Sequence, residues 1–261
     1  MKETWFKRVV REVFFTPGSV RRICIGPLRG MVFRTGTITG LSGWYSGTER
    51  AHQRSFENVV RSGDVVIDVG ANWGLHTLYL SRLVGKDGLV IAIEPFPPAL
   101  DELQWHLRAN GCLNVRVLSC ALGKANGEAP FTLGESASTG SLSAVQTKLP
   151  RQGTEISVVV RTLDSVVEEL GIERLRLVKI DVEGAEAEVL SGACRVMERW
   201  RPHFVIDLHT PMQDVLVAST LVQRGYRLRR LKGPLIFRTD TGWPDRSGVW
   251  GSIEGIPPSV G

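Results

Sequence analysis

The chain has 261 residues, of which 43% are hydrophobic and 23% charged, and this composition excludes wholesale disorder and collagen-like or other low-complexity architectures. At about 150 residues per domain, the length indicates one large domain with additions. No apolar run reaches the roughly 20 residues that span a bilayer, and no cleavable signal opens the chain, so we expect a cytoplasmic protein without a transmembrane segment. The four cysteines form no Cys-x-x-Cys pair, which argues against a zinc framework or a disulfide scaffold.

The net charge of +5 is concentrated near the two ends of the chain. Residues 1–34 hold eight basic and two acidic residues, and a second basic cluster lies within residues 224–232. Such runs are more often solvated faces than binding surfaces. Because no aromatic-interleaved basic motif accompanies them, we expect no nucleic-acid partner.

Apolar runs alternate with helical stretches from Val65 to about residue 230, which is typical of βαβ units and a parallel sheet. We expect strands at residues 65–69, 89–93, 115–118, 175–180 and 203–208. We expect helices at residues 75–84, 97–110, 163–170, 185–200 and 213–224.

Three further segments are predicted outside this alternation. Residues 131–133 and 156–160 look like paired strands around a loop rich in Gly, Ser and Thr. Residues 226–231 and 235–238 are predicted to close the sheet as an antiparallel hairpin. The predicted organisation is an N-terminal lid or cap at residues 1–60 with a helix at 5–14, a catalytic domain at 61–240, and a C-terminal tail at 241–261.

The first motif of interest is the turn Asp68-Val-Gly-Ala-Asn-Trp-Gly74, between the first strand and the first helix. Gly70 and Gly74 lack a Cβ, so a ligand can approach the backbone, and Asn72 tolerates left-handed backbone angles. A glycine turn that only tightens the packing of a helix on a sheet remains an alternative.

Two acids sharpen the choice of ligand. A carboxylate at Asp68 would repel a pyrophosphate but help to position the cationic ammonium and sulfonium groups of S-adenosylmethionine. Glu94 closes the second strand, where an acid can accept both hydroxyls of a ribose. The ribose contact fits NAD and S-adenosylmethionine alike, whereas Asp68 favours the methyl donor.

Several segments together resemble the FkbM family of S-adenosylmethionine-dependent methyltransferases. They are Val66–Gly74, Ile93-Glu94-Pro95, Ala121-Leu122-Gly123, Arg161–Asp164, and Lys179–Glu186 with Val189–Ala193 after it. The resemblance implies a class I methyltransferase fold, a Rossmann-like α/β architecture with a seven-stranded, mostly parallel sheet and helices on both faces. It also implies transfer of a methyl group, usually to an oxygen. The cofactor residues expected from the turn and the resemblance are Asp68, Gly70, Ala71, Asn72, Gly74, Thr77, Glu94, Pro95, Ala121 and Leu122.

The resemblance also places an acidic cluster at the site. In the implied fold, the strands that end near Asp68, Asp181 and His209 are neighbours, roughly 5 Å apart, around one crevice. An alcohol acceptor must lose a proton during methyl transfer, and histidine is a natural base near neutral pH. We therefore predict His209 as the base, with Asp181 and Glu186 as orienting groups. Acids that only complement a helix dipole and a surface histidine are the alternatives.

A second hypothesis for the acidic cluster is a bound Mg²⁺, which we rank below a histidine base that acts without metal. Its ligands would be Asp181 and Glu186 with Asp207 or His209, because Mg²⁺ takes hard oxygen ligands. Asp207 also departs from the family pattern, which more often has glutamate there, and the shorter acid changes the reach of that side chain.

The leading hypothesis is an O-methyltransferase for a hydroxyl of a sugar or secondary metabolite, that is, a small-molecule or glycan-like acceptor. An NAD-dependent oxidoreductase or epimerase is a second reading. Its Tyr-x-x-x-Lys relay is missing, since Glu49, Leu83 and Arg230 stand four positions after the three tyrosines. A non-catalytic adenosine-binding module is the third.

Overall fold

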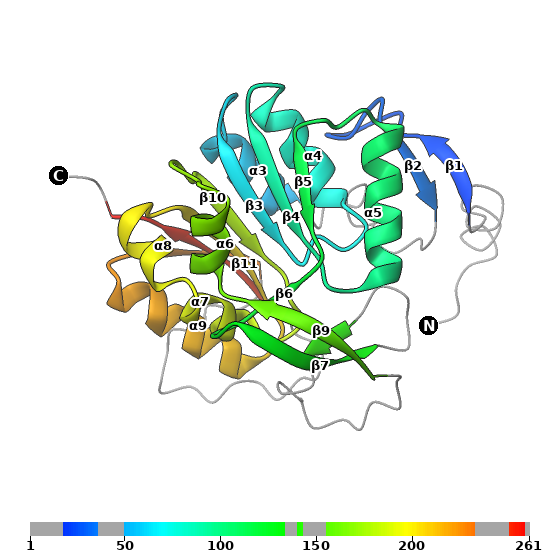
Figure 1. The fold of residues 1–261 in the computed structure, drawn as a ribbon. Helices are drawn as coiled ribbons and strands as arrows, with labels where there is room; N and C mark the ends of the chain where they lie inside the picture. The colour runs from blue at the N-terminus through cyan, green and yellow to red at the C-terminus, as the bar shows by residue number, and fades with distance from the viewer. Residues whose placement is uncertain (1–17, 36–49, 134–139, 143–154, 233–250, 259–261) are drawn as a thin grey trace, which may run out of the picture.

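Seven strands form the central sheet of the computed structural model (Figure 1). The structure describes residues 18–35, 50–133, 140–142, 155–232 and 251–258. The sheet has the strand order β12-β13-β11-β10-β3-β4-β5. Its members are β3 (Val65–Val69), β4 (Leu89–Ile93), β5 (Val115–Leu118), β10 (Leu177–Ile180), β11 (His203–Leu208), β12 (Arg227–Lys232) and β13 (Gly251–Ile256).

All strands of this sheet are parallel except β13, which pairs antiparallel with both β11 and β12. The predicted fold class, a seven-stranded and mostly parallel α/β sheet, is confirmed. Short apolar runs predicted β3, β4, β10 and β11 correctly, because a strand that is buried on both faces is apolar along most of its length.

The C-terminal part of the sheet differs from the expectation. We placed residues 241–261 in a tail, but Gly251–Ile256 is the inner strand β13, between β11 and β12. It is therefore β13 that pairs with β12, whereas residues 235–238 lie outside the described part. The sequence Gly-Ser-Ile-Glu-Gly-Ile carries few apolar residues, so its burial was not apparent from the pattern.

Helices cover both faces of the sheet (Figure 1). One face packs against α3 (Arg50–Val59), α4 (Leu75–Val84) and α5 (Pro97–Ala109). The other packs against α6 (Leu163–Glu169), α7 (Glu186–Ser191), α8 (Cys194–Arg199) and α9 (Pro211–Gln223). Neighbouring strand residues alternate between the two cores, as Val66 and Ile67 do.

The predicted helix at residues 185–200 is two short helices, α7 and α8. A Cβ on Gly192 would overlap the backbone of Gly123, so the chain passes too close there for an ordinary helical side chain. Asp164 then accepts hydrogen bonds from the amides of Arg195 and Val196, at 3.0 and 2.9 Å, and stabilises the start of α8.

A second sheet with the order β6-β9-β7-β8 lies beside the first. It contains β6 (Ala121–Leu122), β7 (Gly127–Leu133), β8 (Gly140–Leu142) and β9 (Glu155–Arg161). The antiparallel pairing of β7 with β9 confirms the predicted strand excursion. This excursion brings β7 to the carboxyl ends of the main strands, where Figure 1 shows it below β10 and β11.

The N-terminal segment is partly integrated into the domain. The hairpin of β1 (Ser19–Arg22) and β2 (Val32–Thr35) lies against α5, where the amide of Arg34 donates to His106 Nε2. Helix α3 buries Phe56 in the core under the sheet. The predicted helix at residues 5–14 lies outside the described residues. In the described ranges, no helix is both long and apolar enough to cross a membrane.

Candidate cofactor pocket and acid–histidine cluster

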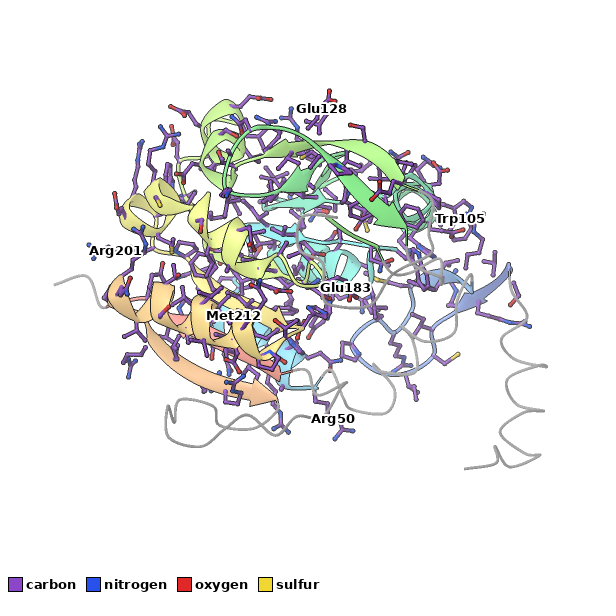
Figure 2. All side chains as sticks on the ribbon, turned by 90° about the horizontal axis from the view of Figure 1, so that it is seen from below. Arg50, Trp105, Glu128, Glu183, Arg201 and Met212 are labelled. Atoms are coloured by element: carbon purple, nitrogen blue, oxygen red, sulfur yellow. The ribbon has the colours of Figure 1, made fainter. Side chains whose placement is uncertain are left out.

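The carboxyl ends of β3, β10 and β11 meet at one edge of the sheet, with β10 in the middle. Asp68 lies near the end of β3, Asp181 directly follows β10, and His209 directly follows β11. This neighbourhood is the one that the resemblance implied. Glu183, from the same loop as Asp181, lies near the middle of the face that Figure 2 presents.

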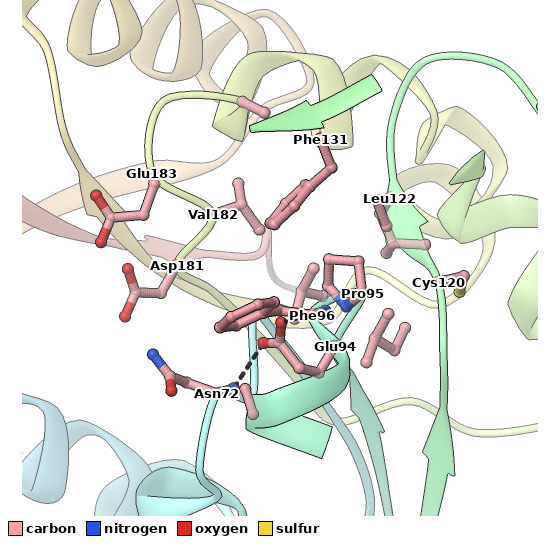
Figure 3. A pocket seen from close by; sticks show the side chains of 16 residues that line it. Asn72, Glu94, Pro95, Phe96, Cys120, Leu122, Phe131, Asp181, Val182 and Glu183 are labelled. Atoms are coloured by element: carbon pink, nitrogen blue, oxygen red, sulfur yellow. Dashed lines mark hydrogen bonds between the residues drawn. The ribbon is translucent and has the colours of Figure 1, made fainter. Parts of the chain in front are cut away.

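A pocket opens at this edge, between the turn after β3 and the loops after β4, β5 and β10 (Figure 3). Its walls combine backbone, apolar side chains and carboxylates. Six of the predicted cofactor residues line it: Gly70, Asn72, Glu94, Pro95, Ala121 and Leu122. The remaining four, Asp68, Ala71, Gly74 and Thr77, are not among its lining residues.

Glu94 is the acid of the pocket wall. Its Oε2 accepts a hydrogen bond from the amide of Asn72 at 2.8 Å, and its Oε1 accepts one from the amide of Phe96 at 2.9 Å (Figure 3). Burial raises the pKa of Glu94 to about 6, although both amides and the charge of Lys179 favour the ionised form. The two amides fix the carboxylate plane, and this geometry is suited to accept the hydroxyls of a ribose.

The opposite part of the pocket is apolar. Phe96, from the loop before α5, and Phe131, from β7, both reach into it (Figure 3). Burial raises the pKa of the adjacent Cys120 thiol to about 11, so this thiol stays protonated at neutral pH and is no nucleophile. An apolar wall beside a carboxylate is the kind of surface on which a purine nucleoside can bind. Phe131 was missed because nothing in its strand pattern distinguishes it from an ordinary core residue.

The glycines of the turn are required partly by packing within the protein. Gly70 has φ +73°, and a Cβ there would overlap the carbonyl oxygen of Asp181. Gly74 has φ +91°, and a Cβ there would overlap the side chain of Leu103. Asn72 adopts φ 50°, the left-handed conformation expected for it. The turn is therefore shaped by close packing on β10 and α5, while its upper surface lines the pocket.

Asp68 lies beneath this turn, where its side chain is fully buried. Thr77 Oγ1 donates a hydrogen bond of 2.6 Å to Asp68 Oδ2, and Lys179 Nζ lies 3.3 Å from Asp68 Oδ1. We expected Asp68 to face the cations of the methyl donor, but its partners are these two buried side chains. Lys179 was missed, although a lone lysine inside the buried strand Leu177–Ile180 signals a buried carboxylate partner.

His209 stands among three carboxylates. Its Nδ1 lies 2.7 Å from Glu186 Oε1, and its Nε2 lies 3.4 Å from Asp181 Oδ1 and 3.7 Å from Glu183 Oε2. Glu186 is fully buried, and its Oε1 also accepts from the amide of Gly184 at 2.9 Å. The predicted set of His209, Asp181 and Glu186 is thus brought together. Glu183 joins it, although we had noted that acid only as one that follows the strand.

The charge of the imidazole follows from this surrounding. Burial lowers the pKa of His209, but the hydrogen bond to Glu186 and the charges of the three carboxylates outweigh it and raise the pKa to about 10. At neutral pH the isolated cluster therefore holds an imidazolium. A base at this position must first give up a proton that its neighbours retain.

Asp207 belongs to a different contact. Its Oδ1 lies 3.0 Å from His52 Nε2 of α3, and both side chains are buried. Burial acts to raise the pKa of Asp207, but the charge and hydrogen bond of His52, together with Lys179, lower it to about 2. Two of the residues that we considered as Mg²⁺ ligands are therefore in contact with other side chains. Asp207 pairs with His52, and Glu186 is taken up by Nδ1 of His209.

Comparison with known proteins agrees with this architecture. Residues 68–228 match the family described as Methyltransferase FkbM domain. "Methyltransferase sdnD" of Sordaria araneosa is 30% identical over 177 residues, which cover 54% of this chain and 68% of that protein. "Hexuronic acid methyltransferase AglP" of Haloferax volcanii is 32% identical over 60% of this chain and 61% of its own length. "31-O-demethyl-FK506 methyltransferase FkbM" of Streptomyces tacrolimicus is 32% identical over 51% of this chain and 60% of its own length.

The fold is also found among solved structures. "Precorrin-6y C5,15-methyltransferase" from Geobacter metallireducens superposes with a TM-score of 0.50 at 13% identity, over 87% of this chain and 94% of that one. The family match decides against the NAD-dependent alternative. With its class I sheet and the match over residues 68–228, the chain belongs to the FkbM domain family of S-adenosylmethionine-dependent methyltransferases.

Proposed function

We propose that the chain transfers a methyl group from S-adenosylmethionine to a hydroxyl oxygen of a small-molecule or glycan-like acceptor. Two of the relatives above are named for such chemistry, one for a hexuronic acid and one for a 31-O-demethyl acceptor. The observation that carries the proposal is that the pocket and the acid–histidine cluster share two residues. Asp181 and Glu183 line the cofactor pocket and also lie beside Nε2 of His209, so proton-accepting groups border the space where a methyl donor would bind.

The residues of the pocket fit the donor. We assign its ribose to the carboxylate of Glu94 and its adenine to the apolar slot of Phe96, Leu122 and Phe131. The backbone of Gly70 and Asn72 would flank the methionine part. When bound, the donor supplies a methyl group on a sulfonium, which transfers as the carbon–sulfur bond breaks. Thr77 and Lys179 act indirectly, because they hold Asp68 under the turn.

The acid–histidine cluster would handle the acceptor. Glu186 orients His209 through Nδ1, so that Nε2 faces Asp181 and the acceptor side. The hydroxyl proton would pass to Asp181 or His209 while the oxygen keeps the electron pair that forms the new bond to carbon. Because the pKa of His209 is raised to about 10, the metal-free base that we predicted would be mostly protonated at neutral pH. Its role as a base therefore requires that the imidazolium be discharged.

The test is a methylation assay with isotopically labelled S-adenosylmethionine. The acceptor panel should contain hexuronic acid glycosides, neutral sugars, hydroxylated secondary metabolites, primary amines and an RNA oligonucleotide. We expect label in a methyl ether of a hydroxylated small molecule, identified by fragmentation in mass spectrometry. Label found only in an amine or in the RNA would overturn the proposal.

A further inference from the structure

Two oxygen donors and one nitrogen donor converge at the pocket, from the loop after β10 and the end of β11. We propose that Asp181, Glu183 and His209 bind a divalent metal cation, and that this cation holds the acceptor oxygen. The binding site follows from this chain's own side chains. Its role in catalysis rests on the proposed function.

The geometry is close to that of an occupied site. One donor atom from each of the three residues can be chosen so that all lie within 4.8 Å of one another. His209 Nε2 is 3.4 Å from Asp181 Oδ1 and 3.7 Å from Glu183 Oε2. In an octahedral site with bonds of about 2.1 Å, neighbouring donors lie about 3 Å apart and opposite ones about 4.2 Å. Small side-chain rotations would therefore bring the three donors onto one ion.

The orientation of the imidazole has the form usual at metal sites. Metal-bound histidines almost always use their second ring nitrogen to donate to a carboxylate or carbonyl, which fixes the tautomer. Glu186, fully buried and 2.7 Å from Nδ1, provides that carboxylate. Its own Oε1 is in turn held by the amide of Gly184. With Nδ1 bound to Glu186, Nε2 points to the two carboxylates that would be the other ligands.

Charge balance around the cluster is a separate argument. Four carboxylates, of Asp68, Asp181, Glu183 and Glu186, lie within 4 Å of one of two cationic side chains, Lys179 and His209. Asp181 Oδ2 lies 3.4 Å from Lys179 Nζ, so that its other oxygen, Oδ1, faces His209. About one third of each of the Asp181 and Glu183 side chains is exposed, and both line the pocket, so an ion can reach them from solvent. These carboxylates outnumber the two cationic side chains, so the cluster would attract a dication.

The donor set limits the choice of ion and of acceptor. Carboxylate oxygens suit Mg²⁺ and Mn²⁺, and an imidazole nitrogen favours the transition metal Mn²⁺ over the harder Mg²⁺. The remaining positions of an octahedral ion would take water and acceptor oxygens. An acceptor with two adjacent oxygens, such as a sugar diol or a hydroxy acid, could chelate it. The ion would lower the pKa of the bound hydroxyl, so that the hydroxyl proton goes to water. An electron pair of the hydroxyl oxygen then forms the bond to the methyl carbon, while the carbon–sulfur bond of the donor breaks and leaves its electron pair on sulfur.

The experiment titrates chelator-treated protein with MnCl₂ and follows free Mn²⁺ by electron paramagnetic resonance, without cofactor or acceptor. We expect one site per chain, and electron spin echo modulation from a coordinated ¹⁴N. Glu183→Gln and His209→Ala should weaken binding by at least tenfold, and His209→Ala should abolish the nitrogen modulation. Glu186→Gln, which removes no ligand, should weaken it by about 10–100-fold. Glu173→Gln, on an exposed acid of the loop before β10, is the charge-matched control and should bind as wild type.

Absence of stoichiometric binding, or binding that all four variants leave unchanged, would overturn the metal site. Circular dichroism verifies that each variant is folded, and Glu183→Gln keeps the shape of the side chain if His209→Ala fails to fold. The methylation assay separates the two proposals. Full turnover in chelator would overturn the role of the cation in holding the acceptor and leave the proposed function standing, whereas Mn²⁺ binding without methylation of any hydroxyl would overturn the proposed function alone.

Discussion

Lys179 Nζ lies 3.3 Å from Asp68 Oδ1, and the two residues face each other as register partners on the adjacent strands β10 and β3. Lys179 Nζ also lies 3.3 Å from the carbonyl oxygen of Gly70 and 3.4 Å from Asp181 Oδ2. Burial lowers the pKa of Lys179, but the charges of Asp68, Asp181 and Asp207 raise it by more. The net pKa is therefore above the usual value, and the ammonium stays charged. One buried cation therefore links the glycine turn after β3 to the acid–histidine cluster.

This link predicts a strong dependence of stability on the pair. Lys179→Met would leave Asp68 buried without its cation, and we expect a loss of about 3–5 kcal/mol in the free energy of unfolding. The double variant Asp68→Asn with Lys179→Met should be more stable than Lys179→Met alone, because no buried charge is left uncompensated. Urea denaturation measures all three. Lys86→Met, at an ion pair whose lysine is 90% exposed, is the control and should change little. Equal losses in Lys179→Met and the double variant would contradict the prediction.

Two glycines with the same backbone conformation should respond differently to alanine. At Gly63, φ is +87° and a Cβ would meet nothing within 4 Å, so Gly63→Ala adds backbone strain alone, about 1–2 kcal/mol. At Gly70 the Cβ would also overlap the carbonyl oxygen of Asp181, and the total loss should be about 2–5 kcal/mol. Gly70→Ala should in addition weaken cofactor binding. Similar midpoints for both variants in thermal unfolding would show that the close approach to β10 is unimportant.

Cofactor affinity should fall in acid because of Glu94. The donor's ribose hydroxyls require the ionised carboxylate, and the pKa of Glu94 is raised by burial to about 6. Above pH 6 the carboxylate is charged and binding is strong. As pH falls through 6 it becomes protonated, so the dissociation constant should be roughly tenfold higher at pH 5 than at pH 8.

Calorimetry at several pH values tests this prediction. Glu94→Gln should weaken binding by about 1–3 kcal/mol and remove the dependence between pH 5 and 8. Asp101→Asn, at an exposed acid of α5, is the matched control and should retain the wild-type profile. A wild-type affinity that stays constant between pH 5 and 8 would rule out Glu94 as the ribose ligand.

Much of this site could be predicted from the sequence, but the contacts between its side chains could not. Strand positions and the adjacency of Asp181 and His209 follow from short apolar runs and from the order that the resemblance implied. Which side of a strand faces the pocket depends on register between segments more than a hundred residues apart, as for Asp68 and Lys179. The burial of Asp207 against His52 depends on α3, whose packing no local pattern reveals.

His209 itself provides the last prediction. If the acid–histidine cluster handles the acceptor, His209→Ala should lower kcat by about 10²–10⁴ while the dissociation constant of S-adenosylmethionine stays close to wild type. The reason is spatial, since the side chains expected to hold the nucleoside are those around Glu94 and Phe131, and His209 is not among the residues that line that pocket.

The matched control is His203→Ala, at the start of the same strand β11 and thus at the opposite edge of the sheet. It removes an imidazole of similar exposure, 22% against 17%, without touching the cluster, so kcat should be unchanged. Steady-state kinetics and equilibrium binding should be measured on both variants. Wild-type turnover by His209→Ala would remove this residue from catalysis and leave Asp181 or solvent as the proton acceptor. A parallel loss of cofactor affinity would instead mean that His209 contacts the donor.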